Sequence, residues 1–391
     1  MENFTLHTPT KIYFGRGRTD ETGAIVRGTG AGKVLVCYGG GSAVRTGLLA
    51  RIERSLTGAG VDYAVLGGVR PNPTAEFSAC TARFARENGC DMLLAVGGGS
   101  VIDSVKMAAY CVDTGFEPWD ITMKRVVPTG RVPVGVVLTI AATGSETSDS
   151  AVLTHEGLKR GFSSDLNRPD FAVMDPELTF TLPAYQTACG TVDIMMHTME
   201  RYFTQGDSLE ITDSIAEGLL RTVMAQAVIL RDDPKNYDAR AEVMWAGSLS
   251  HNGLTGCGHS ESDFASHRLE HELGGMFDVA HGAGLAAVWG SWARYVYKNC
   301  LPRFVRFARN VMGVEAGLSD EETALRGIEN MEDFFRSIHM PTSLSELGVH
   351  PTEAQLCELA RKCKIAVGGL LGSARRLDES DMLAIYKMAN H

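Results

Sequence analysis

The sequence predicts an α/β N-terminal half built on a parallel sheet and an all-α C-terminal half. Up to about residue 183, short apolar runs alternate with longer helical patterns, which is typical of parallel strands covered by helices on both faces of a sheet. From residue 182 onward the strand patterns stop and helical periodicity continues to the end. The chain has 391 residues, 44% of them hydrophobic, which is enough for two domains with full cores. We expect these domains at residues 1–183 and 184–391.

The strands expected in the first half are short apolar runs, two of which end in a row of glycines. Residues 92–96 are entirely apolar, as a central strand buried on both faces would be. The helical patterns between the strands repeat apolar side chains every three or four residues, as Phe77, Cys80 and Phe84 do. The expected strands are residues 34–38, 62–66, 92–96, 133–140 and 171–174, and the expected helices begin near Leu48, Ala75 and Val101.

The second half is predicted as a series of helices with apolar residues at helical spacing. Ser319 and Glu322 form the S-x-x-E pattern of a capping box, which predicts that one of the later helices begins there. The expected helices are residues 191–203, 214–230, 239–249, 263–276 and 285–297, with several more beyond residue 321.

Charge and composition exclude several classes of protein. The formal net charge is −10, from 37 basic and 47 acidic residues, and this argues against a nucleic-acid partner, which would require a basic face. No run approaches the ~20 apolar residues of a membrane span, and the first residues lack the basic region and apolar core of a secretory signal. The nine cysteines include no C-x-x-C pair, so we expect reduced thiols in a cytoplasmic protein without a membrane partner.

Two of the expected strands run into the same four residues, Gly-Gly-Gly-Ser, before a helix begins. The free N–H groups and the dipole of a helix N-terminus favour a phosphate, and glycine lets the phosphate approach the backbone. Neither turn completes the G-x-G-x-x-G fingerprint, because Val44 and Ile102 occupy its last position. A tight connection explains one such turn equally well, whereas two at the carboxyl ends of strands in one sheet favour a dinucleotide. The turns comprise Gly39, Gly40, Gly41 and Ser42, and Gly97, Gly98, Gly99 and Ser100.

Two further segments are less specific. Residues 28–33, GTGAGK, resemble a phosphate loop, but Val34 stands where Ser or Thr is required and the segment precedes a strand, so we expect an ordinary connection. Residues 139–148 carry five hydroxyl groups. They form either a polar turn with a helix cap or a wall that contacts a cofactor, and their spacing does not decide between the two.

Carboxylate and imidazole side chains suggest a metal site in the helical half. Asp193 and His197 are four residues apart, as are His267 and His271, so each pair lies on one face of a helix at a separation that suits chelation. His281 follows at the start of a glycine-containing turn. A buried Asp–His hydrogen bond would explain the first pair alone equally well, but two such pairs favour a metal site. A single metal uses three or four ligands, and spacing alone would pair His267 with His271.

The second histidine pair also belongs to a competing motif. His267, Glu270 and His271 spell H-x-x-E-H, the inverted motif of a zinc peptidase, in which Glu270 would be the general base. A zinc hydrolase of this kind explains neither the pair of Asp193 and His197 nor the two glycine turns. We therefore rank this interpretation below a nucleotide-dependent enzyme.

Seven segments follow one another over most of the chain: YGGGSAVRTG (38–47), PNPT (71–74), VGGGSVIDSVK (96–106), LTIAATGSETS (138–148), FAVMDPELT (171–179), VDIMMHTMERY (192–202) and HRLEHELGGMFDVAHGAGLA (267–286). Together they resemble the iron-containing alcohol dehydrogenase family, specifically its butanol-dehydrogenase-like, NADPH-dependent branch. The resemblance implies a dehydroquinate-synthase-like architecture, with an N-terminal dinucleotide-binding domain and a C-terminal helical domain that binds a metal ion.

The resemblance also implies the metal ligands. In that family the D-x-x-x-H helix and two later histidines, fourteen residues apart, hold the metal. His271 is then not a ligand but lies near the nicotinamide, where it is the candidate for catalytic proton transfer. Glu270 is left as a helix residue without a catalytic duty, which weakens the peptidase interpretation further. The implied ligands are Asp193, His197, His267 and His281.

A nicotinamide dinucleotide is the implied cofactor, with its pyrophosphate at residues 97–100. The turn at residues 39–42 has no carboxylate that would bind a bare ribose 2′-OH, and Arg45 follows it. We therefore expect NADP(H) in preference to NAD(H). Other cofactor-contacting positions of similar proteins are matched by Asn72, Asp103, Thr139, Thr143, Ser145 and Lys159.

The implied reaction is reversible hydride transfer between NADP(H) and a small primary alcohol or aldehyde, such as butanol or butanal. The metal would be Fe(II) by resemblance, and Zn(II) suits the same imidazole and carboxylate ligands. We expect a homodimer with a small-molecule substrate. One alternative is a metal- and NAD-dependent lyase of the dehydroquinate-synthase type, which the apolar surroundings of the D-x-x-x-H pair disfavour. The intact ligand set disfavours the other alternative, a non-enzymatic metal or nucleotide binder.

Overall fold

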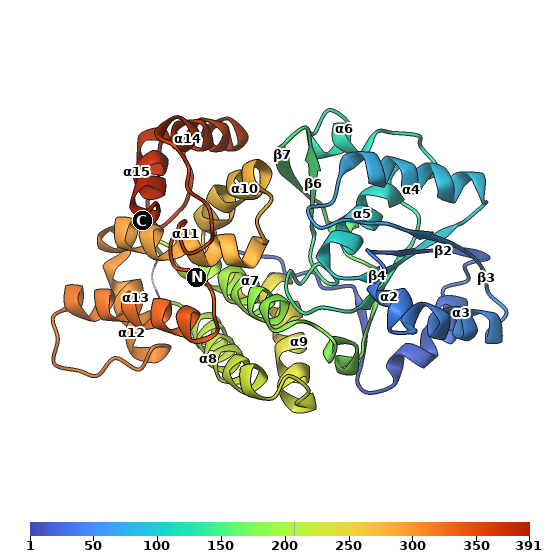
Figure 1. The fold of residues 1–391 in the computed structure, drawn as a ribbon, viewed down its shortest axis with the longest axis horizontal. Helices are drawn as coiled ribbons and strands as arrows, with labels where there is room; N and C mark the ends of the chain where they lie inside the picture. The colour runs from blue at the N-terminus through green and yellow to red at the C-terminus, as the bar shows by residue number, and fades with distance from the viewer. Residues whose placement is uncertain (207) are drawn as a thin grey trace. The chain divides into compact units, whose positions relative to one another are not determined.

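The chain forms two compact units in the computed structural model, which describes residues 1–206 and 208–391. The α/β unit comprises His7–Leu182, and the helical unit comprises Pro183–His391 together with Met1–Leu6. A hydrogen bond from the Glu2 N–H to the carbonyl oxygen of Gly258 (2.9 Å) ties the first residues to the helical unit. Figure 1 shows the strands of the described residues in the α/β unit.

The α/β unit is built on six parallel strands in the order β1-β8-β5-β4-β2-β3. All five strands predicted from the sequence are present. The edge strand β1 is an addition, because its four partly exposed residues show no clear alternation of apolar and polar side chains. The strands are β1 (Lys11–Phe14), β2 (Lys33–Tyr38), β3 (Asp62–Gly67), β4 (Met92–Gly97), β5 (Val134–Leu138) and β8 (Phe171–Met174).

The centre of the sheet is apolar on both faces. β4 is buried along its whole length, and Ile52 and Leu56 pack with Val34 and Leu94 in one hydrophobic cluster. Burial on both faces fixes the register, so the carboxyl ends of β2 and β4 lie side by side and their glycine turns meet at one edge of the sheet. The helices of this unit are α1 (Thr22–Gly28), α2 (Ser42–Arg45), α3 (Leu48–Gly58), α4 (Ala75–Glu87), α5 (Gly99–Ala109) and α6 (Pro118–Thr122) (Figure 1).

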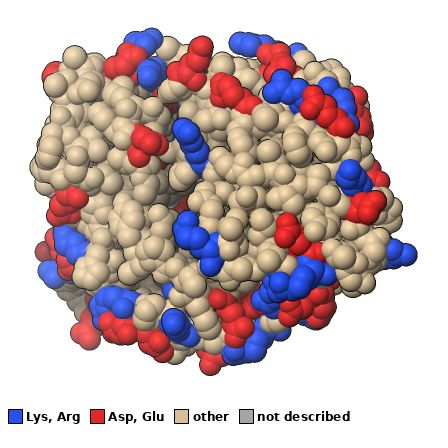
Figure 2. Space-filling model, turned by 45° about the vertical axis from the view of Figure 1, so that its right-hand side comes forward, with Lys and Arg blue, Asp and Glu red and all other residues tan. Residues whose placement is uncertain are grey.

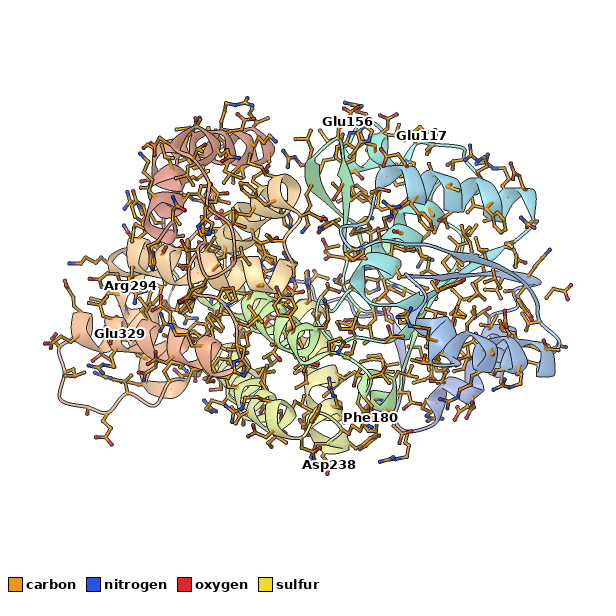
Figure 3. The ribbon with its side chains drawn as sticks, viewed as in Figure 1. Glu117, Glu156, Phe180, Asp238, Arg294 and Glu329 are labelled. Atoms are coloured by element: carbon orange, nitrogen blue, oxygen red, sulfur yellow. The ribbon has the colours of Figure 1, made fainter. Side chains whose placement is uncertain are left out.

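An antiparallel hairpin follows β5 and is not predicted from the sequence. It consists of β6 (Ser150–His155) and β7 (Leu158–Ser163). Glu156, labelled in Figure 3, and Gly157 form the turn, with φ values of 48° and 73°. Positive φ at both positions is what a type I′ turn requires, and Asn or Asp usually occupies the first of them. Glu156 replaces that usual residue, so the sequence lacks the common hairpin pattern.

The described part of the helical unit contains nine α-helices, and each helical range predicted from the sequence overlaps one of them, with ends that differ by several residues. The short helix that begins at Leu301 is not predicted. The helix that begins at His281 starts earlier than expected and places this histidine in its first turn. The Ser319 capping box is confirmed. The helices are α7 (Ala184–Tyr202), α8 (Glu210–Asp232), α9 (Tyr237–His251), α10 (Ala265–Phe277), α11 (His281–Val296), α12 (Leu301–Asn310), α13 (Asp320–Ser337), α14 (Glu353–Val367) and α15 (Glu379–Ala389).

An aromatic core holds α7 and α11 in place. Phe203, which follows α7, stacks on Phe304 of α12 with ring centroids 4.3 Å apart and meets Trp292 of α11 edge-on at 5.9 Å. Arg294 of α11, labelled in Figure 3, also pairs with Glu332 of α13 (Nη2–Oε2 2.7 Å). The two helices that carry Asp193, His197 and His281 are therefore fixed by contacts outside the candidate metal site.

The surface shows no wide field of one charge on the face drawn in Figure 2, where acidic and basic side chains are interspersed. This mixture agrees with the expectation of no nucleic-acid partner, which stays a prediction. Within the part of the chain that the structure describes, no helix is both long enough and apolar enough to cross a membrane.

Candidate metal centre and nucleotide-binding turns

Four of the predicted metal-binding side chains meet around one carboxylate oxygen in the helical unit. Asp193 and His197 lie on α7, His267 on α10 and His281 at the start of α11. The Oδ1 atom of Asp193 is 3.3 Å from Nδ1 of His197, 3.6 Å from Nε2 of His267 and 3.7 Å from Nε2 of His281. The side chain of His281 is 24% exposed, and the other three are almost fully buried. The side of the cluster at His281 is therefore the most exposed one.

The cluster fits a single divalent cation. Asp193 Oδ1, His197 Nδ1 and His267 Nε2 are buried and have no hydrogen-bond partner among the described residues. Buried polar atoms are nearly always satisfied, so atoms left without a partner and facing one another indicate a missing ligand. The ligand atoms of these three residues also lie within 4.8 Å of one another. Imidazole nitrogen with carboxylate oxygen is a donor set that suits both Fe(II) and Zn(II).

The electrostatics of the cluster favour a positive charge at its centre. Burial lowers the pKa of His267, but the carboxylates of Glu200 and Asp193 outweigh burial and raise this pKa to about 9. Burial and the neighbouring His251 hold the pKa of His197 well below its usual value. The acidic neighbours of His267 therefore favour a positive charge at its ring, whereas the ring of His197 stays neutral.

His271 lies beside the cluster but belongs to a different group of side chains. Its ring centroid is 6.4 Å from that of His267 and 5.8 Å from that of His281. Its ligand atom groups with those of Glu270 and His281, while His267 groups with Asp193 and His197. His281 also joins the other group, because its Nε2 atom lies 3.7 Å from Asp193 Oδ1. The implied role of His271 in proton transfer, and not in metal binding, stays a prediction.

Two residues around the cluster, Glu200 and His251, are not predicted from the sequence, and the contact of a third, Glu270, is not predicted either. Glu200 contacts Nδ1 of His267, and Glu270 contacts Nδ1 of His281. The ring of His251 lies 3.8 Å from that of His197, measured between centroids. The interpretation of Glu270 as a helix residue without a catalytic duty stays a prediction, since this contact is with a proposed metal ligand and not with substrate. The pattern that could have suggested Glu200 is its position three residues after His197, on the same face of α7.

The glycines at residues 97–99 are explained by packing within the α/β unit. A Cβ atom added to Gly97 would lie 2.4 Å from Val101, one on Gly98 would lie 2.1 Å from Ile140, and one on Gly99 would lie 2.5 Å from Thr143. The turn must therefore lack side chains whether or not it binds a phosphate. The turn still leads into α5, whose N-terminus is free of a side-chain cap and provides N–H donors.

The turn at residues 39–42 is more open. A Cβ atom on Gly39 would make only ordinary contacts, the nearest at 3.5 Å, and one on Gly40 would meet nothing within 4 Å. Gly41 has φ of +94°, and a Cβ atom there would lie 3.3 Å from the guanidinium of Arg45. Arg45 therefore folds back over this turn instead of extending away from it. Ser42 begins the short helix α2 at the same turn.

Several of the other predicted cofactor residues meet beside the second turn. Asp103 accepts hydrogen bonds from the Ser145 hydroxyl (2.6 Å) and from the Val152 N–H (2.9 Å). Thr143 Oγ1 accepts one from the Ser145 N–H (3.1 Å), and the Thr139 N–H donates to Gly97 (3.1 Å). Residues 139–148 thus form a hydrogen-bonded turn, but it leads into β6 and not into a helix, so the helix cap of the simpler interpretation is not present. The position of the turn next to α5 also suits a cofactor.

Two predicted cofactor residues lie at the edges of this region, and an unpredicted lysine lies beneath it. Lys159 is buried on β7, and Asn72 has φ of 52° in the loop before α4. Lys106 of α5 is fully buried and donates to the carbonyl oxygens of Ser148 (3.1 Å) and Ser150 (2.9 Å). Burial lowers the pKa of Lys106 to about 8. This lysine anchors the segment that carries Thr143 and Ser145.

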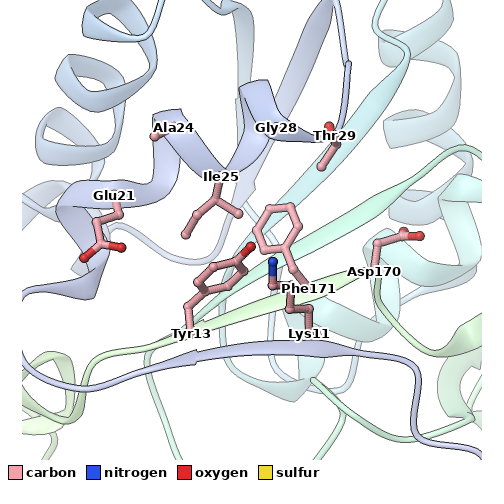
Figure 4. Close-up of a pocket in the computed structure, with 9 residues that line it drawn as sticks. All are labelled: Lys11, Tyr13, Glu21, Ala24, Ile25, Gly28, Thr29, Asp170 and Phe171. Atoms are coloured by element: carbon pink, nitrogen blue, oxygen red, sulfur yellow. The ribbon is translucent and has the colours of Figure 1, made fainter.

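A separate pocket of about 420 Å³ lies in the α/β unit between α1 and the first residues of β1 and β8 (Figure 4). Lys11, Tyr13, Asp170 and Phe171 line it. Because the strands are parallel, their first residues lie at the opposite edge of the sheet from the glycine turns. None of the predicted cofactor residues lines this pocket, and we assign no role to it.

Comparisons with known proteins cover both units. Residues 9–176 match the iron-containing alcohol dehydrogenase family, and residues 187–390 match the C-terminal part of the Fe-containing alcohol dehydrogenase family. The chain is 37% identical over 390 residues to NADH-dependent butanol dehydrogenase A of Clostridium acetobutylicum, with 99% of both chains covered. It is 38% identical over 359 residues to the NADPH-dependent aldehyde reductase YqhD of Escherichia coli, covering 89% of this chain and 90% of that one. The crystal structure of NADH-dependent butanol dehydrogenase A from Thermotoga maritima matches with a TM-score of 0.96 at 36% identity, covering 100% of this chain and 99% of the other.

Proposed function

This chain belongs to the iron-containing alcohol dehydrogenase family, as its seven motif segments predict, and we propose that it interconverts a small primary alcohol and its aldehyde. It is a nicotinamide-dependent oxidoreductase of the alcohol dehydrogenase or aldehyde reductase type. Butanol and butanal are the proposed substrate pair, since four of the relatives are named butanol dehydrogenases. The observation that carries the proposal is the buried cluster in which three imidazole nitrogens surround Asp193 Oδ1.

In the proposed mechanism, Asp193, His197, His267 and His281 hold one divalent metal ion, which supplies Lewis-acid polarisation of the carbonyl oxygen when bound. Residues 97–100 would hold the nucleotide cofactor, which would supply the hydride for reduction of the aldehyde and accept it on oxidation of the alcohol. The burial of the ligands excludes water from most of the cluster, and the partly exposed His281 marks the side from which substrate enters. His271 holds the proton that the substrate oxygen gains on reduction of the aldehyde and loses on oxidation of the alcohol.

NADP(H) is the proposed cofactor in preference to NAD(H). The relatives include both NADH-dependent butanol dehydrogenases and an NADPH-dependent aldehyde reductase, so similarity alone does not choose. The preference is supported by the turn at residues 39–42, which lacks a carboxylate, and by Arg45, which folds back over it. The proposed pyrophosphate contacts are at residues 97–100. Fe(II) is the proposed metal because of the family, and Zn(II) is the second choice.

The proposal also assigns a role to each part of the chain. Residues 1–183 bind the nucleotide, and residues 184–391 bind the metal. We also propose a homodimer in the cytoplasm, and nine cysteines that all carry free thiols support the compartment. Light scattering of the purified chain tests the dimer, which would have twice the 42.1 kDa of one chain.

The test of the proposed function is a matched set of NADPH oxidation assays with butanal. Purified protein is stripped of metal with a chelator and assayed alone, with Fe(II) and with Zn(II). We expect butanal-dependent oxidation of NADPH only after a metal is restored, and the reverse reaction with butanol and NADP⁺. Activity that is independent of the added metal would contradict the metal assignment, and turnover of a phosphorylated or carboxylated substrate without net NADPH consumption would favour the lyase.

A further inference from the structure

We propose that Glu200 and Glu270 are positioning residues that orient the two remote histidines of the cluster, His267 and His281. Each carboxylate engages the Nδ1 atom of one ring, so that Nε2 of that ring faces Asp193. The inference rests on the proposed function only in requiring that the cluster binds a metal.

Glu200 holds both the backbone and the ring of His267. It lies on α7, is 1% exposed, and its Oε1 accepts a hydrogen bond from the His267 N–H (3.0 Å) while its Oε2 contacts the ring Nδ1. His267 is the third residue of α10, and the residue before this helix, Phe264, has φ of 51° and provides no side-chain cap. Glu200 therefore serves as a cap supplied by another helix, and a negative charge is favourable at that position.

Glu270 reaches from α10 to the first residue of α11. It is fully buried, and its Oε2 contacts Nδ1 of His281. Gly284 makes this contact feasible, because a Cβ atom at that position would lie 2.9 Å from Cγ of Glu270 and 3.2 Å from its Oε1. The second glycine of the His-Gly-Ala-Gly segment is thus explained by the space that Glu270 occupies.

The two contacts select the same tautomer in both rings. A carboxylate on Nδ1 accepts the N–H of that nitrogen, so Nε2 keeps a lone pair for a metal. The Nε2 atoms of His267 and His281 lie 3.6 and 3.7 Å from Asp193 Oδ1, almost the same distance. His197 presents Nδ1 instead and shares helix α7 with Asp193, four residues away. A carboxylate partner is therefore seen on the two ligands that come from other helices.

Such carboxylate–histidine–metal arrangements hold the ring of a ligand in place, and loss of the carboxylate typically weakens metal binding by roughly 10–100-fold. The alternative is that the two glutamates only stabilise the helix packing. The two roles differ in their consequences, because a packing role changes the stability of the fold without a specific change in metal affinity. A conservative replacement also distinguishes them, since the amide oxygen of Gln still accepts a hydrogen bond from Nδ1.

The experiment measures the dissociation constant for Zn(II) by competition with a chromophoric chelator in the full chain. The variants are Glu270→Ala, Glu270→Gln, Glu200→Ala and Glu200→Gln. Glu332→Ala is the matched control, because it removes a buried carboxylate of the same unit that pairs with Arg294 instead of a histidine. We expect roughly 10–100-fold weaker Zn(II) binding in the two Ala variants, a smaller loss in the Gln variants and no change in Glu332→Ala.

Several outcomes decide the question. Zn(II) affinity within about twofold of the wild type in Glu270→Ala and Glu200→Ala would overturn the positioning role and leave the proposed function intact. An equal loss in Glu332→Ala would also overturn it, because the effect would then follow from stability. If Glu200→Ala does not fold because the cap of α10 is lost, Glu200→Gln and both Glu270 variants carry the test. A wild-type chain that does not bind Zn(II) or Fe(II) would contradict the proposed function itself.

Discussion

The candidate sites of the two units differ in whether their polar groups already have hydrogen-bond partners. In the helical unit, the candidate metal ligands include buried atoms without hydrogen-bond partners among the described residues, such as Asp193 Oδ1 and His267 Nε2. In the α/β unit, the candidate cofactor residues are glycine turns, and the side chains beside them are already bonded to one another, as Asp103 is to Ser145. The metal site therefore needs a ligand to satisfy its buried atoms, whereas the polar side chains of the cofactor site already satisfy one another.

This difference predicts how each unit responds to substitution. Unsatisfied buried atoms are unfavourable unless something binds them, so the helical cluster is maintained for a ligand and should tolerate no loss of its members. A turn that is stable by itself can change a side chain and still form. Substitutions should therefore abolish function in the helical unit and adjust preference in the α/β unit.

The largest effect is expected for His281→Ala. Removing this ligand should abolish metal binding and lower kcat/KM for butanal reduction by roughly 10³-fold, since the metal provides several kcal/mol of transition-state stabilisation. NADPH binding should stay within about twofold, because the proposed phosphate contacts belong to the α/β unit. Elemental analysis, steady-state kinetics and NADPH fluorescence titration measure the three quantities, and the exposed His350→Ala is the control. Near wild-type reduction of butanal by His281→Ala without bound metal would contradict the claim that the helical cluster functions through a bound metal.

The α/β unit also contains a fully buried charge, and Lys106→Met tests whether it behaves as a satisfied structural group. Burial lowers the pKa of Lys106 from 10.5 to about 8. Between these two values the unfolded chain binds more protons at this position than the folded chain, so the contribution of Lys106 to folding stability rises with pH. The span corresponds to about 3 kcal/mol.

Urea unfolding of both proteins between pH 7.5 and 10.5 provides the measurement for Lys106. Relative to Lys106→Met, which cannot titrate, the wild type should gain up to about 3 kcal/mol of unfolding free energy as the pH rises through this window. A difference between the two proteins that does not change with pH would show that the lysine is not held in the way its burial implies.

His271→Ala should have the next largest effect. It tests whether His271 is a metal ligand or only lies beside the ligands of the helical unit. The variant should keep its metal, because His271 is not among the four proposed ligands. Its kcat should fall by roughly 10²-fold, as expected when a proton donor is lost. Elemental analysis beside steady-state kinetics measures both. Loss of the metal would instead restore the His267–His271 chelate that spacing alone favours.

The sequence predicts well those features that lie within a single helix or strand. The pairing of Asp193 with His197 is predictable because four residues span about one turn of a helix, so any helix over residues 191–203 brings them together. The apolar residues 92–96 are predictable as a central strand because their pattern also lies within one element. Both are properties of a single element, and a periodic pattern contains all that is needed to predict them.

Contacts between different helices and strands cannot be predicted from such periodic patterns. Glu200 and His267 are 67 residues apart, and their pairing depends on how α7 packs against α10. The glycines at 97–99 suggest a phosphate site, whereas the reason that Gly98 lacks a side chain is Ile140, which belongs to a later segment. The hairpin at β6 and β7 is missed because Glu156 takes a turn position where Asn or Asp is usual.

Gly39→Asp should change cofactor preference without loss of the fold. A side chain fits, because the nearest atom to an added Cβ is 3.5 Å away. The new carboxylate would repel a 2′-phosphate and offer an acceptor to the bare ribose, so the ratio of kcat/KM for NADPH to that for NADH should fall about tenfold, or about 1.4 kcal/mol. Gly40→Asn, a nearby uncharged replacement, is the control. A ratio that stays unchanged in Gly39→Asp would place the 2′-phosphate elsewhere.

The smallest effect is expected for Arg45→Ala. Arg45 folds back over Gly41, where its guanidinium can form charge-assisted hydrogen bonds with a 2′-phosphate. The residue is exposed, and exposed ion pairs contribute roughly 0.2–1 kcal/mol, so the preference for NADPH should fall by only about two- to fivefold. Arg45→Lys should retain part of it, because the charge remains while the forked geometry is lost. The measurement is kcat/KM for both cofactors at low and high salt, since the contribution of an exposed charge decreases as ionic strength rises. If the ratio of kcat/KM for NADPH to that for NADH in Arg45→Ala stays within twofold of the wild type, Arg45 does not have the proposed role. A wild type that already prefers NADH would contradict it too. Either result would show that the charge at the open turn of residues 39–42 does not determine the cofactor preference.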